Sequence, residues 1–240
     1  MDKTTWTIVP PLLPTIQRNK FLVSNNLNTS LLRGLEYEHI EKIELHGQVL
    51  DVGGGNTKYN KIFSACKYES VNIDPKMQPT YIVAEGEPYP CPDNYYDFVT
   101  SFNTLEHAYN PIFLLEQMRN KLKSGGKLYL TAPFLYPVHS DPDDYFRPTS
   151  SWISRTLIEC GFINIKIHPL VWGPYTACCF GLGYVGYPGP IKKLRYRTYI
   201  LIDIINSYIR YNRGDTHYTG SYGKKISDKA LGYFVGAEKS

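Results

Sequence analysis

The sequence predicts an α/β fold in which helices cover both faces of a mostly parallel sheet. Between residues 48 and 168, short apolar runs of strand length alternate with segments whose apolar residues recur at helical spacing. This alternation is typical of doubly wound sheets, because two parallel strands need a long crossover between them, usually a helix. A glycine-rich turn follows the first apolar run, and the second run ends in an acid.

The glycine-rich turn, VLDVGGGN at residues 49–56, is a candidate ligand site. Gly53 and Gly55 can adopt positive φ angles, so the backbone can turn sharply and approach a ligand closely. Asp51, at the end of the strand, can accept hydrogen bonds from a cationic or N–H-bearing ligand. Asp74 lies 19 residues after Gly55. In doubly wound folds an acid at about this distance binds the ribose hydroxyls of an adenosine cofactor.

The other elements follow from apolar spacing, helix caps and chain breakers. The prolines near the N-terminus predict an extended arm over residues 1–28. Helices are expected over 29–45 (capped by Thr29 or Ser30), over 56–66, from Asn110-Pro111 onward, and over 150–160 (capped by Ser150 or Ser151). Strands are expected over 48–52, 70–74, 81–83, 96–101, 127–132, 162–168 and 231–237.

Composition bounds the class of protein and its partners. The chain has 240 residues, 42% apolar and 20% charged, which is ordinary for a globular protein. A net charge of +4 is too mild to indicate nucleic acid, and no nucleic acid is expected as a partner. The five cysteines are odd in number and lack metal-ligand spacing, and the N-terminus has no signal-peptide pattern. We therefore expect a reduced, cytoplasmic setting.

Several motifs, in this order and spacing, resemble class I S-adenosylmethionine-dependent methyltransferases of the broad group often labelled type 11. They are the turn at 49–55, Asp74, Glu85-Gly86, the stretch 92–99, Leu105-Glu106-His107 and the turn at 122–128. The family more often has Asp at position 85 and Pro at position 124. A nicotinamide-binding turn would usually read G-x-G-x-x-G, but its last position here is Lys58.

This resemblance implies a Rossmann-like, mostly parallel sheet of seven strands, with a reversed C-terminal hairpin and an insertion before the last strand. It implies S-adenosyl-L-methionine as cofactor. Asp74 would bind the ribose, the pair at 85–86 the adenine, and Asn103 the methionine part. The expected cofactor-binding residues are Asp51, Gly53, Gly54, Gly55, Asp74, Pro75, Glu85, Gly86 and Asn103.

The segment after the fifth strand, residues 133–149, is denser in ionisable and aromatic groups than a connector needs. It resembles the His-x-x-Pro-x-Asp-Tyr-x-Arg pattern of methyltransferases associated with bacterial surface polysaccharide loci. We expect His139 to act as general base, oriented by Asp141 or Asp144. Tyr145 and Arg147 would bind the substrate. In the alternative interpretation, Asp144 and Arg147 pair with each other and only hold the loop together.

His107 is the second candidate base, although it could instead order the start of the following helix. A divalent metal held by Asp141, Asp143 and Asp144 is an alternative for the loop. Neighbouring carboxylates in a loop usually face water, so no metal ligand is assigned.

The chain divides into four parts by this interpretation. Residues 1–46 form an N-terminal arm and helix, 47–168 the cofactor-binding core, 169–230 an insertion, and 231–240 the last strand of the core. The insertion contains a basic, apolar segment at 191–210 that could lie on the inner face of a membrane. The favoured interpretation is that it covers the pocket or forms a homodimer contact. Residues 210–225 are expected to be a loop.

The expected function is O-methylation of a sugar or glycan hydroxyl by in-line transfer, with a histidine base. Within the same class, the acceptor could be a lipid, a quinone or another small metabolite. From a different class, the chain could be a cofactor-binding scaffold that does not catalyse methyl transfer.

Overall fold

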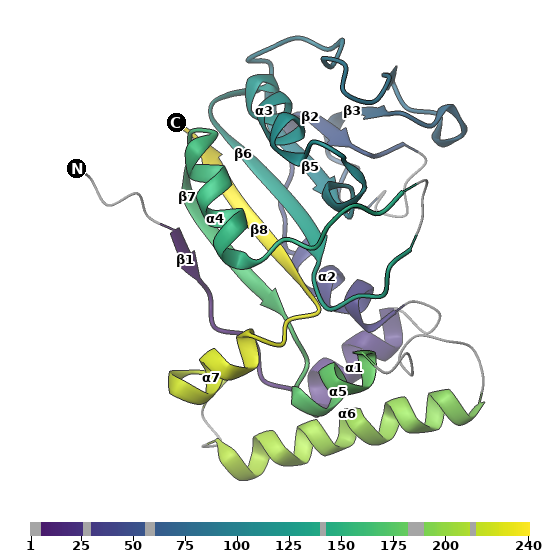
Figure 1. Ribbon diagram of the computed structural model, residues 1–240, viewed down its shortest axis with the longest axis vertical. Coiled ribbons are helices and arrows are strands. Elements are labelled where there is room, and N and C mark those ends of the chain that lie inside the picture. The colour runs from purple at the N-terminus through teal and green to yellow at the C-terminus, as the bar shows by residue number, and fades with distance from the viewer. Residues whose placement is uncertain (1–5, 26–29, 56–60, 140–142, 182–189, 212–214) are drawn as a thin grey trace.

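A computed structural model describes residues 6–25, 30–55, 61–139, 143–181, 190–211 and 215–240 (Figure 1). Within these residues, eight strands form one sheet in the order β1-β7-β8-β6-β5-β2-β3-β4. The strands are β1 (Trp6–Ile8), β2 (Gly47–Val52), β3 (Cys66–Asn72), β4 (Tyr81–Ile82), β5 (Tyr96–Phe102), β6 (Leu122–Pro133), β7 (Phe162–Leu170) and β8 (Gly232–Lys239). The helices are α1 (Ile16–Asn25), α2 (Leu31–Ile40), α3 (Pro111–Lys121), α4 (Ser150–Glu159), α5 (Pro174–Gly181), α6 (Pro190–Arg210) and α7 (Gly220–Ser227), with short 3₁₀ turns η1 (Pro75–Met77) and η2 (Leu105–His107).

The predicted fold class is confirmed. Every strand pair is parallel except those of β8, which runs antiparallel to both β6 and β7. The reversed C-terminal hairpin is therefore present. The additional strand is β1, which pairs in parallel with β7 at the edge of the sheet.

Helices cover both faces of the sheet, as Figure 1 shows for α3 and α4 on the near face and α2 behind it. One apolar cluster joins the near-face helices to the sheet through side chains such as Leu115, Met118 and Leu157. A second cluster joins the sheet to α2, α5 and α6 through side chains such as Leu35 and Ile200. The two buried layers fix the strand ends at which the candidate site lies.

Several predicted element boundaries were wrong. Of the helix expected over 56–66, residues 56–60 lie outside the described residues, 61–65 form turns, and Cys66 begins β3. Thr149, rather than Ser150 or Ser151, caps α4, since its Oγ1 accepts a hydrogen bond from the Trp152 backbone N at 3.2 Å. The start of α3 is as expected, with Asn110 Oδ1 accepting from Phe113 N at 3.2 Å.

The segment between β7 and β8 folds as α5, α6 and α7, so the loop expected over 210–225 is helical from Gly220. Asp203 of α6 is buried and accepts hydrogen bonds from the backbone N of Tyr175 and of Thr176, at 3.1 and 2.8 Å. This carboxylate thereby satisfies the first turn of α5. Ser207 of α6 also donates to the Pro14 carbonyl at 3.0 Å, which docks α6 on the N-terminal arm.

The glycine turn after β2 needs glycine for steric reasons. Gly53 has φ +79°, and a Cβ there would lie 2.1 Å from Thr104 Oγ1. A Cβ at Gly54 would lie 2.0 Å from Asp51 Oδ2. Asn72, at the end of β3, donates from Nδ2 to the Gly53 and Gly54 carbonyls at 2.9 and 3.0 Å. The turn after β2 is thus held in place by hydrogen bonds from the end of β3.

Asp51 lies beneath this turn with only 3% of its surface exposed. Its carboxylate accepts hydrogen bonds from Thr100 Oγ1 at 2.7 Å and from the Tyr68 hydroxyl at 3.1 Å. Burial raises the pKa of Asp51 to about 6, because desolvation outweighs these two hydrogen bonds.

Replacing Asp51 with Asn should change how stability depends on pH. A carboxyl with a folded-state pKa near 6, above its ordinary 3.8, is neutral in both states at low pH. Its ionisation then destabilises the fold as pH rises through 4 to 6, by at most about 3 kcal/mol. Asp51→Asn lacks this titration. Urea unfolding at pH 4 and pH 7 should therefore show the variant gaining stability relative to the wild type at the higher pH. An unchanged difference would contradict the buried, neutralised carboxyl.

Candidate functional site

The predicted cofactor residues gather at one edge of the sheet, beyond the carboxyl ends of β2, β3 and β5. Asp51 and the glycine turn come from the end of β2, Asp74 follows β3, and Asn103 follows β5. These three strands are neighbours in the sheet, so their ends lie together. Ligands in open parallel sheets bind at this edge.

The sequence predicted that Asp74 would end a strand. In the structure β3 ends at Asn72, and Asp74 instead caps the 3₁₀ turn η1. Its Oδ1 accepts a hydrogen bond from Lys76 N at 2.9 Å, and its own N donates to Asn72 Oδ1 at 3.0 Å. Pro75 is the first residue of this turn and is exposed. Among the described residues, Asp74 Oδ2 has no hydrogen bond. One carboxylate oxygen therefore holds the local turn, and the other is available to ligand hydroxyls.

Glu85 and Gly86 lie in the exposed loop that follows β4. Glu85 Oε1 accepts from the backbone N of Tyr109 at 3.4 Å, which links this loop to the segment after η2. Gly86 has φ +79°, a conformation that favours glycine, and the position that a Cβ would occupy is open. The loop reaches the same edge as the glycine turn.

Asn103 points toward α2. Its backbone N donates to the Thr131 carbonyl at 3.1 Å, and its Nδ2 donates to Glu36 Oε2 at 3.0 Å. Glu36 is fully buried, and Arg33 Nη1 lies 3.1 Å from the same oxygen. Burial raises the pKa of Glu36 despite these partners. Sequence reasoning missed Glu36, although it lies one turn from Leu32, on the apolar face of the helix.

Glu106 is a third buried acid at this edge, after Asp51 and Glu36. Its side chain has no solvent exposure, and neither carboxylate oxygen has a hydrogen-bond partner among the described residues. Burial, with a smaller contribution from the nearby charge of Glu36, raises the pKa of Glu106 to about 8. The sequence marked Glu106 only as part of the Leu-Glu-His motif. Burial thus favours the uncharged forms of both Glu36 and Glu106.

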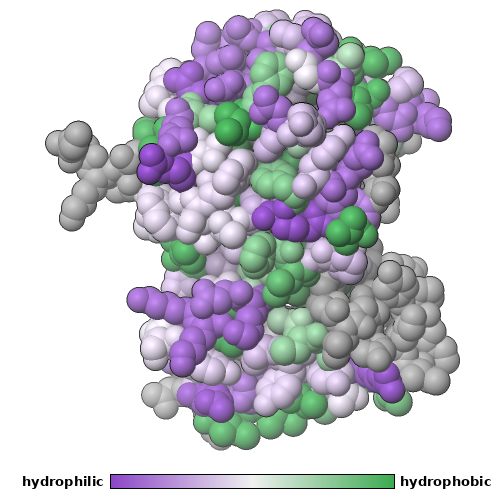
Figure 2. All heavy atoms as spheres, viewed as in Figure 1, coloured by the Kyte–Doolittle hydropathy of each residue, from purple (hydrophilic) through white to green (hydrophobic). Residues whose placement is uncertain are grey.

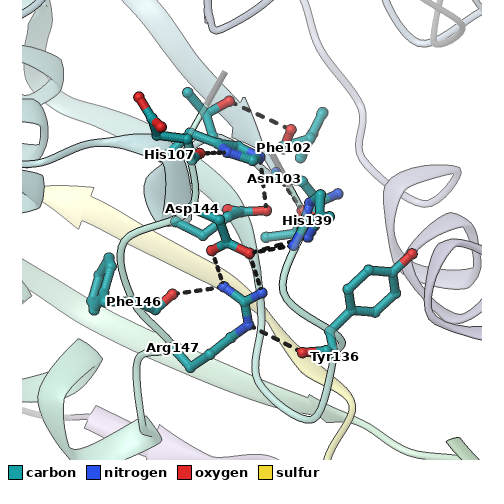
Figure 3. A network of polar contacts seen from close by, with 12 residues as sticks. Phe102, Asn103, His107, Tyr136, His139, Asp144, Phe146 and Arg147 are labelled. Atoms are coloured by element: carbon teal, nitrogen blue, oxygen red, sulfur yellow. Dashed lines mark hydrogen bonds and ion pairs between the residues drawn. The ribbon is translucent and has the colours of Figure 1, made fainter. Parts of the chain in front are cut away.

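The loop after β6 is organised by an ion pair (Figure 3). The Arg147 guanidinium contacts both carboxylate oxygens of Asp144, with Nη2 to Oδ2 at 2.5 Å, and donates to the carbonyls of Tyr136 and Pro137. Asp144 Oδ2 also accepts from the His139 backbone N at 2.9 Å. Hydrogen bonding to Arg147 lowers the pKa of Asp144 to about 2. The pair holds the loop in the way the alternative interpretation describes.

His107 and His139, which the sequence offered as rival bases, lie next to each other. Their ring centroids are 5.0 Å apart, with the rings nearly perpendicular. His107 Nδ1 contacts the Asp143 carbonyl oxygen. His139 Nδ1 lies 3.2 Å from the Pro137 carbonyl oxygen and 3.3 Å from Asp144 Oδ2. In both rings Nδ1 is engaged within the loop.

Tyr145 and Asp141 are the remaining predicted site residues. Tyr145 is 43% exposed and packs edge-on against Tyr109, with centroids 5.4 Å apart. Its hydroxyl donates to Asp143 Oδ2 at 3.3 Å, and its backbone N donates to the Glu106 carbonyl at 2.8 Å. Asp141 lies outside the described residues.

A separate cavity of about 180 Å³ lies against another side of α2, and none of the predicted site residues lines it. His39, His168 and His217 contribute to its wall. Burial lowers the pKa of His39 to about 3 and that of His168 to about 4, so both are neutral. Its wall also includes the charged side chains of Arg18, Glu38 and Lys42, and it contains no glycine turn.

Comparison with known proteins identifies the family. A family model described as methyltransferase domain matches residues 25–157, which is more than half of the chain. The chain is also 31% identical over 146 residues to the uncharacterized protein MJ1123 of Methanocaldococcus jannaschii, covering 53% of this chain and 71% of that protein.

Solved structures share the fold at low identity. An S-adenosylmethionine-dependent methyltransferase from Mesorhizobium loti superposes with TM-score 0.55 at 14% identity, covering 87% of this chain and all of that one. A putative methyltransferase in complex with the Haloferax volcanii Trm112 activator gives 0.53 at 14%, covering 93% and 94%.

A larger enzyme also matches this chain. Phosphoethanolamine N-methyltransferase 2 of Haemonchus contortus, in complex with S-adenosyl-L-methionine, gives TM-score 0.50 at 15% identity. The match covers 93% of this chain but only 56% of that enzyme, so the chain spans little more than half of its length. From the family match and the shared fold together, we conclude that the chain belongs to the methyltransferase-domain family, whose methyl donor is S-adenosyl-L-methionine.

Proposed function

We propose that the chain transfers a methyl group to a hydroxyl of a sugar or glycan. The observation that carries this proposal is the pair of imidazoles, His107 and His139, beside the buried Glu106 at the cofactor edge of the sheet. A hydroxyl must lose its proton when it is methylated, so its methyltransferase needs a proton acceptor near the reacting oxygen. An amine that reacts through its free lone pair has less need of one.

The cofactor site is proposed from residues that fit S-adenosyl-L-methionine sterically and chemically. The turn at 53–55 has no side chains to block a close approach, and Asp74 keeps one carboxylate oxygen for the ribose. Glu85 would accept from the adenine amino group, and buried Asp51 would face the charged methionine end. When bound, the cofactor supplies an electrophilic methyl group on a sulfonium.

His139 is the proposed base in this scheme. Asp144 and the Pro137 carbonyl engage its Nδ1, which leaves Nε2 to accept the acceptor's proton. The Asp144 carboxylate would then stabilise the imidazolium, as carboxylates do beside catalytic histidines. Asp144, rather than Asp141, therefore takes the orienting role. His107 would bind or position the acceptor beside it.

The loop supports a sugar acceptor through its aromatic residues. Tyr109 and Tyr145 are exposed and in contact, and such rings combine an apolar face with a polar hydroxyl. Tyr145 keeps its proposed role in substrate binding. The donors of Arg147 are engaged within the loop, so this residue supports the site by holding the loop rather than by contacting the acceptor.

The outer face of α6 supports an acceptor presented at a membrane surface. Figure 2 shows hydrophobic side chains at the lower end of the molecule, where Figure 1 places this helix. The first half of α6 is rich in Lys and Arg, and basic amphipathic helices bind anionic lipid. No helix among the described residues is long and apolar enough to cross a membrane. The exposed apolar residues of α6 are Leu194, Leu201, Ile205, Tyr208 and Ile209.

Cofactor binding can be tested at Asp74. Asp74→Asn keeps an oxygen to cap η1 but loses the second carboxylate oxygen and the charge. We expect calorimetric titration with S-adenosylhomocysteine to give an affinity about tenfold or more weaker, as expected when a charged hydrogen bond is lost. Asp228→Ala, an exposed acid after α7, is the matched control and should bind as the wild type does. Equal affinities for all three proteins would remove Asp74 from the site.

The reaction can be tested with radiolabelled cofactor and a panel of mono- and oligosaccharides. We expect label in the sugar fraction that resists alkali, because an ether survives conditions that cleave a methyl ester. His139→Gln should lower turnover by about 100-fold or more and leave cofactor affinity unchanged. His217→Gln, a histidine of the separate cavity, is the control. Alkali-labile label, or full turnover in His139→Gln, would contradict the proposal.

Membrane binding can be tested with vesicles of neutral and anionic phospholipid. Leu201→Glu/Ile205→Glu places two charges on the exposed apolar face of α6 and should weaken co-sedimentation by about tenfold or more. Ile112→Glu, on the exposed side of α3, is the matched control. If light scattering instead shows a dimer that the double variant breaks, α6 is a subunit contact and the membrane proposal is wrong.

A further inference from the structure

Three potential metal ligands converge at the reaction end of the site. One ligand atom from each of Glu106, His107 and His139 lies within 4.8 Å of the others. Glu106 and His107 belong to η2 after β5, and His139 comes from the loop after β6. Two neighbouring strand ends thus bring them together, and Figure 3 shows both imidazoles in this region. The sequence predicted no such cluster, because Glu106 and His139 are 33 residues apart.

The two imidazoles are held in the way that metal-bound histidines usually are. A ligating histidine commonly donates its other ring N–H to a backbone carbonyl or a carboxylate, which fixes the ring and its tautomer. Here His107 Nδ1 contacts the Asp143 carbonyl oxygen. His139 Nδ1 lies near the Pro137 carbonyl oxygen and Asp144 Oδ2. Each ring therefore keeps Nε2 as a free ligand atom, and His107 Nε2 is 3.7 Å from Glu106 Oε1.

Glu106 provides a second, independent observation. Its carboxyl group is fully buried, and neither oxygen has a hydrogen bond among the described residues. Buried polar groups almost always have partners, since an unpaired one destabilises the fold. His107 Nε2 lies 3.7 Å from Glu106 Oε1, which is too far for a hydrogen bond. A cation between them would satisfy the carboxylate and both rings.

We propose that Glu106, His107 and His139 bind one divalent cation. Two imidazoles and one carboxylate favour a transition metal such as Mn²⁺, Fe²⁺, Co²⁺ or Zn²⁺ over Mg²⁺ or Ca²⁺, which prefer oxygen ligands. Three protein ligands leave coordination positions open for an acceptor oxygen. The proposal differs from the sequence-based alternative of Asp141, Asp143 and Asp144, because Arg147 already engages the Asp144 carboxylate.

The cation would activate the acceptor hydroxyl in the proposed O-methylation, and this role rests on the proposed function. A cation lowers the pKa of a hydroxyl bound to it, and the proton can then leave to water. The acceptor oxygen forms its bond to the methyl carbon, and the broken C–S bond leaves its electron pair on sulfur. A histidine nitrogen that ligates a metal cannot also accept this proton. His139 is therefore a ligand when the cation is bound, and a base only without it.

Metal binding can be measured without any methyl transfer. The chelator-stripped full chain is titrated with Mn²⁺ by calorimetry and with Co²⁺ by visible absorption. We expect one ion per chain. Glu106→Gln and His139→Gln should each weaken binding by about tenfold or more, whereas His217→Gln should not. Mn²⁺ should also broaden the imidazole NMR signals of His107 and His139 in the wild type, a readout that needs no ligand variant.

The outcomes separate the two proposals. The cation site would be overturned if the stripped wild type bound no metal. It would also be overturned if both ligand variants bound metal as the wild type does and the signals of these two rings were not broadened. Methyl transfer to a sugar that survives complete chelation would keep the proposed function and return His139 to the role of base. Tight binding at these residues without transfer to any sugar would keep the cation site and reject the acceptor.

Discussion

The Asp51 carboxylate sits directly beneath a turn of three glycines, and the rest of the site depends on how that turn is held. Thr100 and Tyr68 hydrogen-bond to the carboxylate from β5 and β3, while Asn72 clamps the Gly53 and Gly54 carbonyls from the end of β3. Three adjacent strands thereby fix one backbone conformation that a side chain would block. Burying an acid whose pKa is raised destabilises the fold near neutral pH. Such a group, at the edge where open parallel sheets bind ligands, is more readily explained by binding than by packing.

A second set of polar groups, in α2 and η2, is also poorly matched to its buried surroundings. Glu36 and Glu106 are buried, and three of their four carboxylate oxygens have no hydrogen bond among the described residues. The Asp144–Arg147 pair, in contrast, is well satisfied and gives the loop after β6 a defined shape. The satisfied pair positions His139, and the unsatisfied acids mark where a ligand, a proton or a cation would be accommodated. The Asp144–Arg147 pair therefore has a structural role, whereas the neighbouring buried acids are the candidates for a chemical one.

The sheet was predictable because its signals are local. Apolar runs, the glycine turn and Asn110-Pro111 each specify a strand, a turn or a helix start within a few residues. The N-terminal elements β1 and α1 were missed because their proline-rich and polar sequence gains its structure from tertiary contacts. Strand β1 pairs with β7, and Arg18 of α1 forms an ion pair with Glu38 of α2. Glu36 was missed for a related reason: only tertiary packing shows that an acid on an apolar helix face meets Asn103. The convergence of His107 and His139 likewise depends on strand order, which no local pattern encodes.

We propose that the glycine turn and the buried acids face one cofactor, with its sulfur toward His107, His139 and Glu106. A crystal structure of the chain with S-adenosylhomocysteine tests this directly. The account predicts the ribose on Asp74, the backbone of residues 53–55 against the ligand, and the sulfur directed at the two imidazoles. Ligand bound instead in the separate cavity beside His39 and His168, or a sulfur directed away from the imidazoles, would contradict it.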